Sequence, residues 1–95
     1  MKLKEIKKNM EGLKDWSLEP WAIQKEFNFG TFAEALDFVN RVGKISEEAG
    51  HHPDIVILFS SVRIVLTTHS EKEVTQKDCD LARKIDDLQN VTAIA

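Results

Sequence analysis

The sequence predicts an α+β fold, in which helices pack on one face of a four-stranded antiparallel sheet. Its length of 95 residues suits a single domain, residues 1–95, with one hydrophobic core. Apolar residues recur at helical spacing in three segments, and segments rich in β-branched and aromatic residues lie between them. The resulting order is helix, strand, strand, helix, strand, strand, helix, which is typical of α+β domains.

The first part of the chain is expected to supply one helix and two strands. Residues 2–13 predict a short amphipathic helix, ended by Gly12, because apolar residues recur there at spacings of three and four. Residues 16–29 carry aromatic and branched side chains that are interrupted by Pro20. This pattern predicts two short strands around a turn, or one strand broken at the proline.

The second helix has a start signal and a stop signal. Thr31 begins the pattern of a capping box, so the helix is expected to run from Thr31 to about Ala49. Gly50 is suited to end it, and Pro53 prevents the helix from resuming. The residues between this glycine and this proline are therefore expected to form the loop between the helix and the next strand.

A hairpin and a last helix are expected to complete the fold. Residues 55–69 are rich in β-branched residues and are broken at Ser60-Ser61, which predicts two strands joined by a turn at these serines. The first of these strands is apolar on both faces, so one face is expected to contact the helices and the other a second subunit. Thr75 and Asp78 repeat the capping pattern, and the last helix is expected to run to about Asn90.

Composition and charge argue against several classes of partner. The net charge of −3 and the pI of about 5.6 give no general attraction to nucleic acid or to anionic lipid. The sequence has no apolar run of the length that a signal peptide or a bilayer span requires. The single cysteine, Cys79, cannot form an internal disulfide and fits a reducing compartment. We expect a cytoplasmic protein with no direct nucleic-acid or membrane partner.

The three histidines of the chain are predicted to gather at one rim of the fold. His51 and His52 lie in the loop after the second helix. His69 ends the second hairpin strand, and the tight turn folds that end back toward the start of the first strand, next to His52. Glu47, one helical turn before His51, is placed to orient an imidazole by accepting a ring N–H. Because imidazoles exchange protons near neutral pH, this gathering suggests acid–base chemistry.

Structural roles compete with catalysis for these residues. A histidine after a helix C-terminus can cap the last carbonyls, and Asp78 is explained as a capping carboxylate at the third position of its helix. Trp16 and Phe59 fit a core or a pocket wall better than chemistry. Three histidines and a glutamate could also hold zinc or iron, but adjacent residues in extended backbone point to opposite sides, which disfavours one shared ion. Cys79 lies in a helical stripe, where thiols are normally inert.

Several segments together resemble the pterin-4a-carbinolamine dehydratases, also called dimerisation cofactor proteins. They are EEAGHHPDI, an aromatic Phe59 five residues beyond Asp54, VRIVLTTHS and TQKDCDLARKID. The resemblance extends over residues 16–86, nearly the whole chain. The chain departs from many members by having Ile55 and Ile57 after the proline, and SEKE after the strand histidine. These departures spare all three histidines.

The resemblance implies a homodimer or homotetramer that dehydrates 4a-hydroxytetrahydropterin to the quinonoid dihydropterin. This step recycles the pterin after aromatic amino acid hydroxylation, so functional coupling to such a hydroxylase is also implied. Carried over residue by residue, the catalytic histidines of the family fall on His51, His52 and His69. The substrate-binding positions that we expect beside them are Glu47, Pro53, Phe59, Asp78 and Trp16.

The chemistry of this dehydration fits the residues. Hydroxide is a poor leaving group, so cleavage of the C4a–O bond requires an acid at the oxygen, while a base removes the N5 proton. Two imidazoles can perform both transfers near neutral pH, and no metal, nucleotide or redox cofactor is required. The alternative is a non-catalytic binding or assembly protein with the same fold, as are some relatives that lack the full histidine set.

Overall fold

The structure is a computed structural model that describes residues 2–94, with the side chains of residues 2–89. Its elements, in chain order, are α1 (Leu3–Asn9), β1 (Ser17–Leu18), β2 (Ile23–Asn28), α2 (Phe32–Ala49), β3 (Asp54–Leu58), β4 (Ser61–Leu66) and α3 (Gln76–Ile94). This order confirms the predicted α+β class and the predicted sequence of helices and strands. Among the described residues, no helix combines the length and the apolar character needed to cross a membrane.

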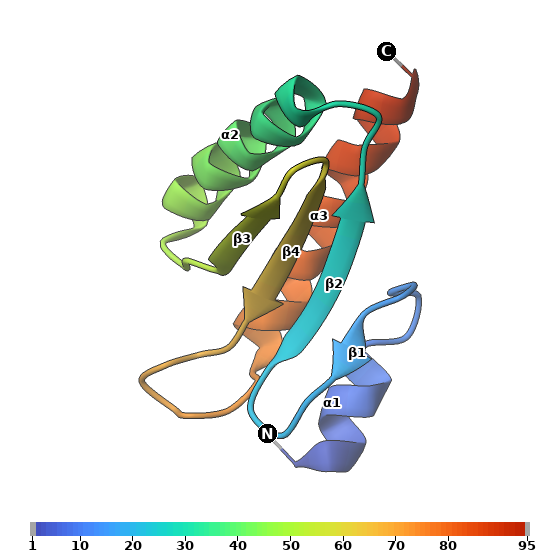
Figure 1. Ribbon diagram of the computed structural model, residues 1–95. Helices are drawn as coiled ribbons and strands as arrows, with labels where there is room; N and C mark the ends of the chain where they lie inside the picture. The colour runs from blue at the N-terminus through green and yellow to red at the C-terminus, as the bar shows by residue number, and fades with distance from the viewer. Residues whose placement is uncertain (1, 95) are drawn as a thin grey trace.

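The four strands form one antiparallel sheet in the order β1-β2-β4-β3. β2 and β4 pair along their whole length, from Ile23 opposite Leu66 to Asn28 opposite Ser61. β3 pairs with the other side of β4 and lies at the edge of the sheet. Figure 1 shows α2 and α3 behind the sheet, α1 beside β1 at one end, and no helix over the front of the sheet.

The core lies between this sheet and the two long helices. Side chains alternate along a strand, so every second residue of β2 and β4 points inward. Phe27 of β2 is fully buried, and its ring centroid lies 4.8 Å from that of Phe38 on α2. Trp16 packs edge-on against Phe27, with their centroids 6.1 Å apart. Fully buried aliphatic residues complete the core, among them Ile23, Val42, Val62, Ile64, Leu66 and Ile85.

Both ends of α2 agree with the sequence prediction. The hydroxyl of Thr31 accepts a hydrogen bond from the backbone N–H three residues later, at 3.1 Å. At the other end Gly50 adopts the left-handed conformation, with φ of 64°. Its N–H donates to the carbonyl of Glu47, and the N–H of His51 donates to the carbonyl of Ser46. These two bonds form a Schellman motif, which fixes the direction in which the chain leaves α2.

The two other helices differ in length from the prediction. α1 ends at Asn9 instead of residue 13, because the backbone turns at Met10 and Gly12 lies in the following turn with φ of 87°. Leu13 nevertheless packs against the core from outside the helix. α3 runs to Ile94 and so extends past the predicted end at Asn90.

The hairpin turn lies one residue earlier than predicted. Leu58 is opposite Ser61, so the turn residues are Phe59 and Ser60, not Ser60 and Ser61. The neighbouring strand helps to fix this register, because the N–H of Phe29 donates to the carbonyl of Ser60 at 2.8 Å. Phe59 is left in the turn with φ of 53°, which is uncommon for a bulky residue, and with 78% of its surface exposed.

The left-handed cap of α2 can be tested by substitution. Gly50→Ala is expected to lower the free energy of unfolding by about 1 kcal/mol, because a side chain is disfavoured at its φ of 64°. Gly30→Ala, before the other end of the same helix, is the control. Its new Cβ would meet only the flexible carboxylate of Glu34, at 3.5 Å, so the expected change is below about 0.5 kcal/mol. Urea denaturation measures both, and equal losses would contradict the argument.

Candidate active site

The C-terminal cap of α2 brings His51 to the beginning of α3. The ring nitrogen Nε2 of His51 lies 2.6 Å from Oδ1 of Asp78, in the first turn of α3. The side chain of His51 is mostly buried, and Asp78 is completely buried. Two residues that are far apart in the sequence therefore form a short, sheltered imidazole–carboxylate contact.

The second oxygen of this carboxylate is held by two threonines. The hydroxyl of Thr68, just after β4, donates to Oδ2 of Asp78 at 2.8 Å. The backbone N–H of Thr75 donates to the same oxygen at 2.9 Å, and the two threonine hydroxyls lie 2.7 Å apart. Asp78 thus caps α3 as the sequence suggested, but capping is only part of its role. It also joins α3 to the end of β4 and to the loop after α2.

This arrangement fixes the hydrogen positions on the His51 ring. A carboxylate can only accept hydrogen bonds, so the contact requires His51 to donate through Nε2–H. In the neutral ring the proton then sits on Nε2, and Nδ1 carries a free lone pair. Nδ1 is thereby left as the ring nitrogen that can accept a hydrogen bond or a proton.

His52 has a different environment from its neighbour. Its Nε2 lies 2.6 Å from Oε1 of Glu47, and the two side chains are 61% and 77% exposed. The predicted contact of Glu47 with an imidazole is therefore present, but the imidazole is that of His52, not that of His51. An exposed pair of this kind contributes little to stability. The pair instead holds the accessible imidazole of His52 in place after the C-terminal end of α2.

His69 lies beside this group through the backbone. It directly follows Thr68, whose hydroxyl bonds to Asp78, and it begins the loop that returns to α3. The loop is closed by a hydrogen bond from the N–H of Thr68 to the carbonyl of Glu73, at 3.1 Å. The side chain of His69 is exposed, and within residues 2–89 no hydrogen bond links its ring to the other two. The three histidines share one end of the sheet without direct contact.

Two hollows border the His51–Asp78 contact. One, of about 380 Å³, is lined by Thr68, Thr75 and the residues around them, and the other, of about 250 Å³, includes His51. Lys77 lines both hollows, and in the smaller one its positive charge shares the lining with His51. A larger hollow of about 430 Å³ lies between α1 and the β1–β2 turn, and no histidine lines it. Of these three, only the hollow of about 250 Å³ is lined by a histidine, and the hollow of about 380 Å³ is lined by the two threonines that bind Asp78, so we take these two as the candidate site.

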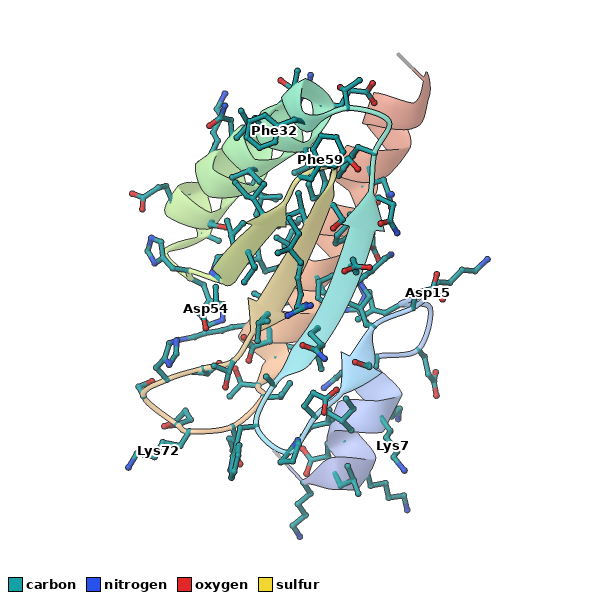
Figure 2. All side chains as sticks on the ribbon, in the orientation of Figure 1. Lys7, Asp15, Phe32, Asp54, Phe59 and Lys72 are labelled. Carbon is teal, nitrogen blue, oxygen red and sulfur yellow. The ribbon has the colours of Figure 1, made fainter. Side chains whose placement is uncertain are left out.

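The other predicted site residues lie in three different places. Pro53 is in the loop with the histidines, directly before β3. Phe59 is in the turn at the opposite end of β3 from Asp54, as Figure 2 shows. Trp16 is buried in the core, and its Nε1–H donates to Asp86 of α3 at 3.1 Å. Within one chain, neither aromatic residue is brought to the histidines.

Neither a metal nor a nucleophilic cysteine finds support in the geometry. The part of the chain that the structure describes contains no group of three or more His, Cys, Asp or Glu side chains that could hold an ion. His51 and His52 contact different carboxylates, as expected for adjacent residues that point apart. Cys79 is fully buried, and this burial raises the pKa of its thiol above the ordinary value.

Comparison with known proteins gives a consistent set of relatives. A family model described as pterin 4 alpha carbinolamine dehydratase matches residues 1–88. A protein of Sulfurisphaera tokodaii named "Putative pterin-4-alpha-carbinolamine dehydratase" is 42% identical over 85 residues, 90% of this chain and 91% of that one. A protein of the same name from Cyanothece sp. is 45% identical over 87 residues, 92% of this chain and 90% of that one.

Two solved structures have the same fold. A crystal structure of a transcriptional coactivator/pterin dehydratase from Brucella melitensis superposes with a TM-score of 0.87 at 29% identity, covering 93% of this chain and 96% of that one. A pterin dehydratase-like protein identified as a RuBisCO assembly factor in the alpha-carboxysome superposes with a TM-score of 0.64 at 27% identity. It covers 77% of this chain and 84% of its own.

The two carboxylates are expected to respond differently to neutralisation. Asp78→Asn should lower the free energy of unfolding by about 2–4 kcal/mol, because it leaves buried donors on three segments without their charged acceptor. Glu47→Gln, the matched change at the exposed pair, should alter it by less than about 0.5 kcal/mol. Urea unfolding monitored by Trp fluorescence compares them. A loss at Asp78 no larger than at Glu47 would refute the anchoring role of the buried carboxylate.

Proposed function

Because the chain belongs to the pterin 4 alpha carbinolamine dehydratase family, we propose that it dehydrates 4a-hydroxytetrahydropterin to the quinonoid dihydropterin. The observation that carries this proposal is the contact of His51 with the buried Asp78, with two further imidazoles on the same end of the sheet. Dehydration needs two proton transfers at different atoms, and this end of the fold offers three groups suited to them.

In the proposed mechanism His51 is the base. Its Nε2–H is held by Asp78, so Nδ1 is free to take the proton from N5 of the substrate as the C=N bond forms. The C4a–O bond breaks in the same reaction, and the electron pair leaves with the oxygen. In this mechanism Asp78 orients the ring and holds its tautomer, as the carboxylate does in other carboxylate–histidine pairs.

The acid must deliver a proton to the departing hydroxyl, so that water leaves in place of hydroxide. His52 and His69 are the candidates, because both are exposed and neither is held by a buried group. The exposed Glu47 can keep a protonated His52 in place at the rim. The histidine that does not act as the acid is proposed to bind the substrate.

The remaining parts of the proposal concern partners and setting. We propose a homo-oligomer, a pterin as the small-molecule substrate, and coupling to an aromatic amino acid hydroxylase that produces this substrate. The reaction consists of proton transfers and loss of water, so it needs no electron carrier and no metal to proceed. A cytoplasmic location fits the single buried Cys79 and stays a prediction.

A non-catalytic role is the second candidate. It is favoured by the fold that the chain shares with the RuBisCO assembly factor, a pterin dehydratase-like protein. A binding protein would use the surface of the fold and would not need the His51–Asp78 contact. That contact places a buried charge at the rim, which a binding role does not require, so the geometry favours the enzyme.

The catalytic assignment predicts a large loss for each histidine. His51→Ala, His52→Ala and His69→Ala should each lower the dehydration rate, by on the order of 10²–10⁴-fold for the acid and for the base. The measurement is the decay of carbinolamine generated by a hydroxylase, with and without the protein. Replacing two histidines should cost less than the product of the single losses, since the groups act in one reaction.

A matched control separates chemistry from folding. Arg41→Ala removes an exposed side chain on α2 that is paired with Asp37, and it should dehydrate substrate at the wild-type rate. Circular dichroism melts show whether each histidine variant is folded. If folded histidine variants match the wild type in rate, catalysis is wrongly assigned and the binding role becomes the better proposal.

The absence of a metal requirement is also testable. Protein treated with EDTA and then freed of it by gel filtration is expected to keep its full dehydration rate. Metal content is measured on the same sample before and after treatment. A stoichiometric zinc or iron whose removal abolishes turnover, and whose return restores it, would overturn this part of the mechanism.

A further inference from the structure

The hydroxyl of Thr75 has a hydrogen-bond partner of a different kind from that of its counterpart before α2. Thr31 directly precedes α2, and its hydroxyl accepts from the backbone N–H of Glu34, as in a usual N-terminal cap. Thr75 directly precedes α3, but there the N–H of Asp78 donates to the carbonyl of Thr75, at 3.1 Å. The Thr75 hydroxyl lies 2.7 Å from the hydroxyl of Thr68. The residue before α3 therefore directs its hydroxyl to another segment of the chain.

The direction of the bond between the two hydroxyls follows from the number of hydrogens. A hydroxyl has one hydrogen to donate, and a carboxylate can only accept. The hydrogen of Thr68 is used in the bond to Oδ2 of Asp78, at 2.8 Å. In the contact between the two hydroxyls, Thr75 must therefore be the donor. The hydrogen bonds then run in one direction, from Thr75 through Thr68 to the carboxylate.

The loop between β4 and α3 brings these two hydroxyls together. The N–H of Thr68 donates to the carbonyl of Glu73 at 3.1 Å, and the N–H of Lys72 donates to the carbonyl of Thr68 at 2.8 Å. Lys72 adopts a left-handed conformation with φ of 56°, which is uncommon for a residue with a side chain. Figure 1 shows this loop at the end of the sheet where the loop after α2 leads into β3. The chain thus turns back tightly enough for Thr75 to reach Thr68.

Two bonds at Oδ2 restrict the orientation of the Asp78 carboxylate. Thr68 donates to this oxygen through its hydroxyl, and Thr75 donates through its backbone N–H. A carboxylate held by a single bond can rotate about its Cβ–Cγ bond, whereas two donors from different segments restrict this rotation. The other oxygen, Oδ1, contacts Nε2 of His51 at 2.6 Å. The direction of the imidazole, and so of its Nδ1, therefore depends on both donors.

Burial increases the effect of each bond in this chain. Asp78 is fully buried and Thr68 is 4% exposed, so water has little access to their polar atoms. Hydrogen bonds in a chain polarise one another, so donation by Thr75 makes the Thr68 hydroxyl a better donor. Thr75 itself is partly exposed and lines the hollow of about 380 Å³. The chain of bonds thus runs from the wall of this hollow to the buried carboxylate.

We infer that Thr75 is a positioning residue, which holds the carboxylate of Asp78 through Thr68 and thereby sets the direction of the His51 ring. It acts on the reaction without touching the atoms that react. This effect rests on the proposed function, in which Nδ1 of His51 takes a proton from the substrate; the order of the hydrogen bonds does not. Small errors in the placement of a catalytic group lower the rate, because the reaction requires a close and aligned approach.

Kinetics of variants without these hydroxyls test the inference. Thr75→Val should lower kcat roughly three- to tenfold, the effect of one neutral hydrogen bond, and leave KM unchanged. Thr68→Val removes a bond to a charged group and should lower kcat roughly ten- to a hundredfold. Thr75→Ser and Thr68→Ser retain a hydroxyl and should keep the wild-type rate. An unchanged kcat in Thr75→Val would overturn the positioning role, and a raised KM alone would show instead that Thr75 binds substrate.

The double variant tests whether Thr75 acts through Thr68. If the hydroxyls form one chain, removing both should lower kcat no further than Thr68→Val does. Losses that multiply would show that Thr75 acts separately, and the chain would be wrong. Thr31→Val is the control, because it removes the hydroxyl before α2, at the other end of that helix from the histidines. It should lower the melting temperature and keep the wild-type rate; a comparable fall in kcat would reduce the effect at Thr75 to the loss of a helix cap.

Hydrogen exchange at His51, followed by nuclear magnetic resonance, tests the chain without any assay of activity. The hydrogen on Nε2 is held by the buried carboxylate, so it should exchange slowly with water in the wild type. Thr75→Val should make this exchange roughly three- to tenfold faster, and Thr75→Ser should not. Equal exchange in wild type and Thr75→Val would overturn the chain. An inactive wild type that shows the expected difference would refute the proposed function and leave the chain of hydrogen bonds in place.

Discussion

The buried carboxylate of Asp78 is the interaction on which the arrangement of this site depends. It connects three segments: the start of α3, the end of β4 and the loop after α2. A fully buried carboxylate is costly unless its oxygens are matched by donors, and here Thr68, Thr75 and His51 supply them. The same carboxylate therefore holds three segments of the fold together and forms part of the candidate site.

The two adjacent histidines show how one loop can provide unlike groups. His51 is sheltered and held by a buried acid, whereas His52 is open to solvent and held by an exposed one. Because successive side chains point apart, the Schellman motif at Gly50 sends one ring toward α3 and the other toward the rim. Two adjacent histidines thus acquire different environments, as the proposed division into a base and an acid or substrate ligand requires.

Much of the fold could be predicted because its signals are local. Periodicity gave the order of elements, and the residues Thr31 and Gly50 gave the limits of α2. The turn at Phe59 was misplaced by one residue, because its register depends on a bond to Phe29 in another strand and serines are common turn residues. Local pattern cannot report a hydrogen bond between strands.

The candidate site was only partly accessible to the same reasoning. Hairpin geometry predicted the histidine pair before one strand and His69 at the end of the next; β4 in fact ends at Leu66, and His69 lies beyond it at the same end of the sheet. The hydroxyl of Thr68 was missed, although it precedes His69 directly, because a threonine in a strand-rich segment is ordinarily explained by β propensity. Phe59, expected beside the substrate, lies in the turn at the opposite end of β3 from the histidines, because the register of the hairpin decides its place and the local pattern does not report that register.

The contact of Trp16 with Asp86 gives α3 a second anchor. Asp86 accepts from the indole and from Lys25, two turns beyond Asp78 on the same helix. A helix held at one point could rotate about that point, but a helix held at two points about 12 Å apart keeps its orientation. The alignment of the imidazole with its acid is therefore set partly by an indole in the core. The first turn of α3, which carries Asp78, is thus held in its orientation partly by the bonds that Asp86 makes two turns further along the helix.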